Sequence, residues 1–234
     1  MSNDVTLVLV HGAWADGSSW GRVIDEVEAA GVRAVAVPLP LSSFEDDVAA
    51  LEHTLEHVGG PVVLAGHAYA GGVIAAAAAE NVRALVYVAA LAPEEGEAVA
   101  EIFGRGTPHP QAPALAPDAH GLIWLPDEAF AGAFAHRATA AEHVRLRATQ
   151  RPISITCITT PVGRPRWKDL PTWYLIAQED RMISVDNQRF MAERMGATVR
   201  SHPVDHMVLL TAPEVVSDLL LEVARKVGKD LAQA

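Results

Sequence analysis

Short stretches far apart in the sequence carry residue types that together could break an acyl bond. Residues 66–71 read Gly-His-Ala-Tyr-Ala-Gly and lie between an apolar run and an alanine-rich run. A Gly-x-Ser-x-Gly turn presents a serine nucleophile from this setting, between a strand and a helix. Ala68 occupies the position of that serine. Ala70 replaces the last glycine of the pattern, which is a milder change because alanine is also small.

A second stretch, residues 11–14, ends the first apolar run with His-Gly-Ala-Trp. A loop in this position can help to form an oxyanion hole, in which two backbone N–H groups stabilise the negative charge that develops on a carbonyl oxygen. The loop supplies one N–H group, and the residue after the nucleophile supplies the other. We therefore assign the two donors to Ala13 and Tyr69.

An acid and a histidine follow in the chain order that such a site requires, which is nucleophile, acid, histidine. Asp180 stands in the turn after an apolar strand-like run, and His206 follows the last predicted strand. Asp180 would hold the His206 ring in the tautomer that accepts a proton from the nucleophile and passes it to the leaving group. Glu179 and Asp205 remain alternatives for the acid, and a buried structural role remains the alternative for His206.

The elements that must position these residues are predicted from an alternation of apolar runs and helix-like segments. This alternation is typical of a parallel sheet with helices on both faces, whose ligands bind beyond the carboxyl ends of the strands. Ser18 or Ser19 is the expected cap of the first helix, which ends before Gly31. Six strands are predicted at residues 6–10, 32–38, 61–65, 82–88, 172–177 and 198–202, and later helices at residues 43–57, 69–80, 185–195 and 212–227.

The alternation breaks between residues 94 and 165, where four prolines are followed by two predicted short helices at residues 126–136 and 139–150. We expect one compact domain, with residues 1–93 and 166–234 as the core and residues 94–165 as a small helical cap over the carboxyl edge of the sheet. Trp14 and Trp124 are expected to line the pocket because loop and cap meet there. His67 is a third pocket candidate, with packing as the alternative.

Composition narrows the classes of protein further. The 18 basic and 29 acidic residues give a formal net charge of −11, which disfavours nucleic acid because its phosphates would be repelled. Cys157 is the only cysteine, so neither an intramolecular disulfide nor a cysteine-based zinc site can form. The histidines lack metal-ligand spacing, and we expect no metal. A polar start and the lack of a run of roughly 18 apolar residues predict a cytoplasmic protein without a membrane span.

Taken together, these motifs resemble those of the α/β-hydrolase superfamily over essentially the whole chain. The likeness is greatest to its small, short-capped branch, which includes plant methyl-ester esterases and hydroxynitrile lyases. It is carried by residues 8–14, 66–72, 174–180 and 205–206. The resemblance implies an α/β-hydrolase fold, no cofactor, and a serine acyl-enzyme acting on a small carboxylic ester, lactone or related acyl substrate. It is also compatible with a homodimer.

Ala68 departs from this family pattern at the reacting atom. Loss of the nucleophile costs on the order of 10⁶-fold in kcat, or about 8 kcal/mol, so we expect the chain as written to be nearly inactive as an esterase. One interpretation is an alanine introduced into an otherwise intact enzyme. The alternatives are a natural pseudoenzyme that binds a small apolar ligand, and cofactor-free chemistry of lyase or oxygenase type in which His206 and Asp180 move a proton.

Overall fold

The centre of the molecule is a six-stranded sheet, seen in a computed structural model that describes residues 5–233. Its strands follow the order β2-β1-β3-β4-β7-β8, and all neighbouring strands are parallel. This confirms the predicted doubly wound α/β sheet. The strands are β1 (Thr6–Val10), β2 (Ala34–Val37), β3 (Val62–His67), β4 (Val82–Val88), β7 (Thr172–Ala177) and β8 (Thr198–His202).

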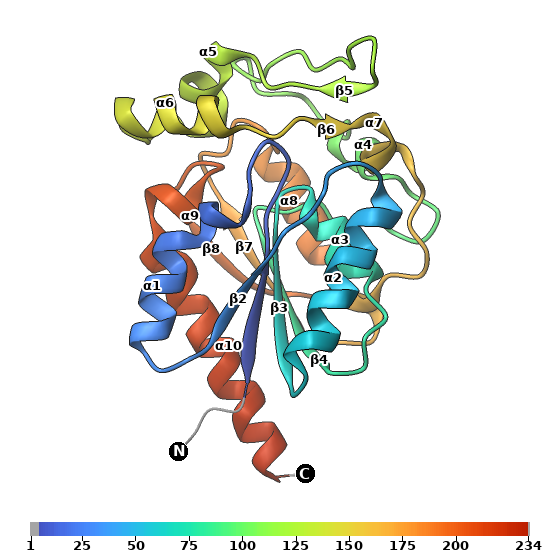
Figure 1. The fold of residues 1–234 in the computed structure, drawn as a ribbon, viewed down its shortest axis with the longest axis vertical. Coiled ribbons are helices and arrows are strands. Elements are labelled where there is room, and N and C mark those ends of the chain that lie inside the picture. The colour runs from blue at the N-terminus through green and yellow to red at the C-terminus, as the bar shows by residue number, and fades with distance from the viewer. Residues whose placement is uncertain (1–4, 234) are drawn as a thin grey trace.

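Helices cover both faces of the sheet because the strands are apolar on both sides (Figure 1). Leu7 and Leu9 pack towards α1 (Gly21–Ala29) and α10 (Pro213–Gln233), whereas the alternating Val8 and Val10 belong to the core on the opposite face. That second face carries α2 (Phe44–Val58), α3 (Ala70–Ala76) and α8 (Val185–Arg194). In residues 5–233, no helix has both the length and the apolar character needed to cross a membrane.

Two details of the core helices differ from the prediction. The first helix begins with a 3-10 turn, η1 (Gly17–Trp20), and its cap is Asp16, whose carboxylate accepts the N–H of Ser18; the expectation of a serine cap was therefore wrong. The helix predicted at residues 69–80 ends at Ala76. Ala77 has extended backbone (ψ 124°), and Arg166 donates to the carbonyls of Ala77 and Ala79 in the segment after the helix.

Between β4 and β7, the chain lies over the carboxyl ends of the strands, at the top of Figure 1. The predicted short helices are present, and Thr139 and Glu142 form a capping box at the start of the second. The short pair of antiparallel strands, β5 and β6, was not predicted because two residues are too few to show a period. The elements of this segment are α4 (Val99–Phe103), β5 (Leu122–Ile123), α5 (Asp127–Ala129), η2 (Phe130–Phe134), α6 (Ala140–Thr149), β6 (Ile153–Ser154) and α7 (Ile155–Thr159), and η3 (Arg166–Lys168) and α9 (Val208–Thr211) complete the fold.

Candidate active site

The turn between β3 and α3, here called the elbow (residues 66–71), has the strained geometry that presents a nucleophile. Ala68 lies at its centre with φ +50°, in the left-handed region that residues other than glycine seldom adopt. Backbone hydrogen bonds hold it there, from Ala68 N–H to Val88 O (3.3 Å) and from Leu91 N–H to Ala68 O (2.9 Å). The elbow therefore keeps its conformation although its central side chain is only a methyl group.

The loop after β1 lies beside the elbow because Val10 pairs with Gly66 across the parallel strands. A β-carbon on Gly12 would lie 3.0 Å from the Cβ of Ala68, so glycine permits this close approach. The N–H groups of Ala13 and Tyr69 have no acceptor within residues 5–233, and both residues line the same cavity as Ala68. Two free backbone donors next to Ala68 are what an oxyanion hole requires.

Of the three candidate acids, Asp180 is the one bonded to His206. The Nδ1 of His206 lies 2.8 Å from Oδ2 of Asp180, and both side chains are buried. Glu179 instead forms an ion pair with Arg137. Asp205 accepts the backbone N–H of Arg137 and the hydroxyl of Thr211.

Asp180 is fixed in place by further donors. Its Oδ1 accepts the N–H groups of Met182 (2.7 Å) and Ile183 (2.9 Å), and its Oδ2 also accepts the side-chain amide of Gln188 (3.0 Å). A carboxylate only accepts, so the ring N–H of His206 is on Nδ1 and Nε2 is left to accept a proton. His206 lines the cavity together with Ala68. The pair can therefore move a proton at the surface of the cavity.

His67 and Trp124 do not line this cavity, contrary to expectation. His67 is buried behind it and donates from Nε2 to the carbonyl of His206 (2.8 Å). Burial, and then the nearby His206 ring, lowers the pKa of His67 to about 3, so this ring is neutral. Trp124 directly follows β5 and is 49% exposed, whereas Ile123 at the end of β5 is buried and lines the cavity. Trp14 lies in the wall as expected, and its indole N–H donates to Ile123 O (3.0 Å).

The cavity has a volume of about 200 Å³ and is walled largely by apolar side chains of the segment above the sheet. Sequence reasoning missed these residues because they lie in short elements without a clear hydrophobic period. Within residues 5–233, histidine, cysteine and acidic side chains form no cluster that could hold a metal ion. The apolar wall residues from this segment include Val99, Phe103, Leu115, Ile153, Ile155 and Ile158.

Asp47 is a further residue that sequence reasoning missed. It is fully buried in α2, and its Oδ2 accepts the phenol of Tyr69 (2.7 Å) while its Oδ1 accepts the N–H of Leu41 (2.7 Å). Burial raises the pKa of this carboxyl, and the two hydrogen bonds oppose the rise. Asp47 thereby anchors the side chain of Tyr69, which lines the cavity. Its only sequence signal was an acid on the face of α2 that also carries Leu51.

A parallel α/β sheet that carries a strained strand-turn-helix, two backbone N–H groups without acceptors and an acid–histidine pair at its carboxyl edge is typical of the class of α/β-hydrolases. A family model described as the alpha/beta hydrolase family matches residues 7–219. The chain belongs to this family.

Individual relatives are more distant. Methylesterase 2 of Arabidopsis thaliana is 24% identical over 93% of this chain and 95% of its own length. The pyrethroid hydrolase of Sphingobium faniae JZ-2 has a TM-score of 0.81 at 22% identity, covering 94% of this chain and 98% of its own. Tomato methylketone synthase I, solved as a histidine-to-alanine variant with beta-ketoheptanoate, has a TM-score of 0.83 at 18% identity, covering 96% and 99%. At these identities the solved structures support the fold alone.

Proposed function

We propose that the cavity is the substrate site of a carboxylic-ester hydrolase, and that Ala68 keeps this site in a form that binds substrate without forming an acyl-enzyme. The observation that carries the proposal is the convergence of three features on one cavity. They are the strained elbow at Ala68, the free N–H groups of Ala13 and Tyr69, and the His206–Asp180 pair. The names of the relatives agree, since they include methylesterases and a pyrethroid hydrolase.

With serine at position 68, each group has a defined role. Nε2 of His206 removes the serine proton as the hydroxyl attacks the ester carbonyl, and Asp180 stabilises the resulting imidazolium. The N–H groups of Ala13 and Tyr69 stabilise the oxyanion. His206 then protonates the leaving alcohol, and water attacks the acyl-enzyme by the same route. The alanine side chain has no atom that can attack, so the reaction stops at the bound ester.

The test is the substitution Ala68→Ser, assayed with p-nitrophenyl acetate and butyrate beside the unchanged chain. We expect kcat to rise by several orders of magnitude, because a missing nucleophile costs on the order of 10⁶-fold. The matched control adds His206→Ala to Ala68→Ser and should return the rate to that of the unchanged chain. Equal rates for the Ala68→Ser and unchanged chains would contradict the proposal.

A second candidate function follows from Ala68 itself, since some carbonyl chemistry needs no nucleophile. A β-keto acid loses carbon dioxide when the electrons of the C–C bond pass into an enolate, and the enolate then takes up one proton to give a methyl ketone. The N–H groups of Ala13 and Tyr69 would stabilise the enolate oxygen, and protonated His206 would supply the proton. The neighbour solved with beta-ketoheptanoate is a methylketone synthase.

This candidate predicts that the unchanged chain releases carbon dioxide and 2-hexanone from β-ketoheptanoate, with no need for serine at position 68. Release would be measured by gas chromatography against the spontaneous reaction, with His206→Ala as the matched control. A rate equal to the spontaneous one would exclude decarboxylation and leave the ester-hydrolase proposal in place.

A further inference from the structure

We infer that the cavity selects an uncharged carbonyl compound with a single short apolar chain and discriminates against a carboxylate of the same length. This inference rests on the proposed function in one respect, which is that the carbonyl binds at the elbow. The wall of the cavity is almost entirely apolar. Besides His206, only Trp14 and Tyr69 bring side-chain polar atoms to it, and both already donate elsewhere, to Ile123 O and to Asp47. A ligand therefore meets hydrocarbon everywhere except at His206 and the two backbone donors.

The charges around the cavity also favour an uncharged ligand. The residues that line the cavity include no lysine or arginine. Arg151 and Arg181, each close in sequence to a lining residue, are engaged elsewhere, with Leu39 O (2.8 Å) and Gly132 O (2.9 Å). A bound carboxylate would lose its water without gaining a fixed cation, and it would face Asp180 across the His206 ring. A ketone or ester carbonyl needs only the backbone N–H groups.

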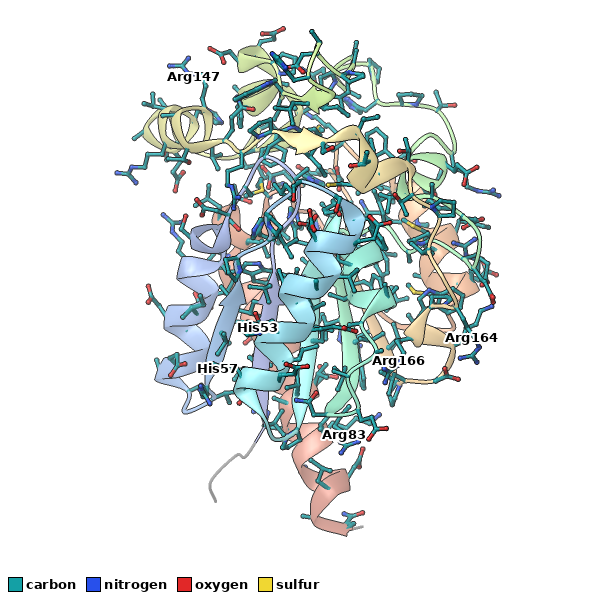
Figure 2. The ribbon with its side chains drawn as sticks, turned by 45° about the vertical axis from the view of Figure 1, so that its right-hand side comes forward. His53, His57, Arg83, Arg147, Arg164 and Arg166 are labelled. Atoms are coloured by element: carbon teal, nitrogen blue, oxygen red, sulfur yellow. The ribbon has the colours of Figure 1, made fainter. Side chains whose placement is uncertain are left out.

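More distant cations cannot compensate. Figure 2 shows Arg83, Arg164 and Arg166 in the lower half of the view, and none of the three lines the cavity. Arg147 lies on α6 in the upper part of the view, and its guanidinium pairs with Asp127 (3.5 Å). None of these four arginines lines the cavity, so none of them supplies a fixed cation to a carboxylate bound there.

The size and direction of the cavity limit the length of the ligand. A cavity of about 150 Å³ lined by Leu, Ile and Phe holds benzene, so about 200 Å³ accommodates roughly six to eight carbon atoms. Its inner end is formed by Ala68 and His206, which are buried, and its outer end by Phe103 and Pro117, which are exposed. With the carbonyl at the elbow, an alkyl chain extends along Val99 and Ile153 towards that opening.

The experiment measures binding to the unchanged chain, so no turnover is needed. Isothermal titration calorimetry at pH 7.5 would compare 2-alkanones of five to eleven carbons with the straight-chain carboxylates of equal length. We expect the affinity for ketones to rise about 4-fold per methylene (~0.8 kcal/mol) up to roughly eight carbons and then to level off. Carboxylates of equal length should bind at least about 10-fold more weakly.

A pair of variants at Ile155, a partly buried wall residue, tests the role of charge directly. Ile155→Lys places a flexible cation at the wall and should narrow or reverse the preference for ketones. Ile155→Met is the matched control with a similar apolar side chain and should keep that preference.

Three results would each overturn the inference. They are a ketone affinity that does not vary with chain length, no detectable ketone binding, and carboxylates that bind as well as ketones. Tight carboxylate binding would also favour the decarboxylation candidate. The two proposals fail separately. Length-dependent ketone binding combined with an inactive Ala68→Ser variant would refute ester hydrolysis and keep the selectivity. An active Ala68→Ser variant combined with ketone binding that does not depend on chain length would support ester hydrolysis and refute the selectivity.

Discussion

Two imidazole rings lie next to each other, His206 in the wall of the cavity and His67 buried behind it, and their surroundings give them different properties. The ring centroids of His67 and His206 are 4.8 Å apart. His206 has Asp180 as a partner, whereas His67 donates only to a backbone carbonyl and its Nδ1 has no partner within residues 5–233. Desolvation is the main reason why the pKa of His67 falls from 6.5 to about 3.

This shift predicts how stability depends on pH. Below pH 6.5 the unfolded chain protonates His67 while the folded chain does not, so this group lowers the free energy of unfolding by about 1.4 kcal/mol per pH unit down to about pH 3. His67→Gln should reduce that dependence in urea denaturation at pH 7, 6 and 5. His53→Gln is the control, because His53 is exposed on α2 (Figure 2). This variant should leave the pH dependence of the free energy of unfolding unchanged. The same pH dependence in His67→Gln as in the unchanged chain would refute this explanation.

Two buried tyrosines offer a matched test of the Asp47 contact. The Tyr69 hydroxyl donates to Asp47, whereas the Tyr87 hydroxyl has no partner in the described part of the chain. Tyr69→Phe leaves a buried carboxylate oxygen without its donor and should lower the free energy of unfolding by about 1–3 kcal/mol. Tyr87→Phe removes an unsatisfied group and should leave that energy unchanged or raise it. Equal losses in urea denaturation would count against a role for the hydrogen bond.

Residues at the ends of strands were the easiest to predict. Ala68 follows β3 directly, and Asp180 and His206 come three and four residues after the ends of β7 and β8. Parallel strands bring such ends to one edge of the sheet, so topology places these residues near one another. Trp124 could not be placed in this way. Which of Ile123 and Trp124 faces inwards depends on the phase of the two-residue strand β5, and tertiary contacts set that phase.

At the scale of the element, α3 can carry the elbow only because its first turn packs against backbone. A β-carbon on Gly71 would lie 2.1 Å from Leu91 O, in the loop after β4. Gly71→Ala should therefore lower the free energy of unfolding by roughly 3 kcal/mol, because backbone cannot move aside cheaply. Gly132→Ala is the control, because a β-carbon there would have nothing within 4 Å and the φ of Gly132 is not positive. This variant should leave the free energy of unfolding unchanged or raise it by up to about 1 kcal/mol. Similar urea midpoints for the two variants would contradict this account of the packing.

Element types were predicted well, and element ends less well, for a physical reason. The spacing of apolar residues predicts which face of a helix or strand is buried. The same spacing continues along the whole of β1 or α10, so the type of each element can be predicted. The backbone turns extended at Ala77, and Arg166, which is distant in the sequence, donates to the carbonyls of Ala77 and Ala79 just beyond the end of α3. No local pattern contains that information.

At the scale of the molecule, we propose that residues 94–165 act as a cap that is less stable than the core. Residues 104–117 are mostly exposed and contribute Leu115 and Pro117 to the cavity wall. Their amides should exchange with deuterium much faster than those of β1, β3 and β4, and 2-octanone should slow exchange in this stretch. Mass spectrometry of peptides with and without ketone would measure this. Uniform exchange across the chain, or no effect of the ketone, would contradict the proposal.

The left-handed turn at position 68 has a consequence for protein engineering. Main-chain hydrogen bonds and close glycine packing set the direction of the Cα–Cβ bond at position 68. This direction therefore does not depend on which side chain the residue carries. Thiol, hydroxyl or selenol groups installed there would all start from the same point, facing the same imidazole. The chain is thus a ready host for comparing the intrinsic reactivity of different nucleophiles within one unchanged setting.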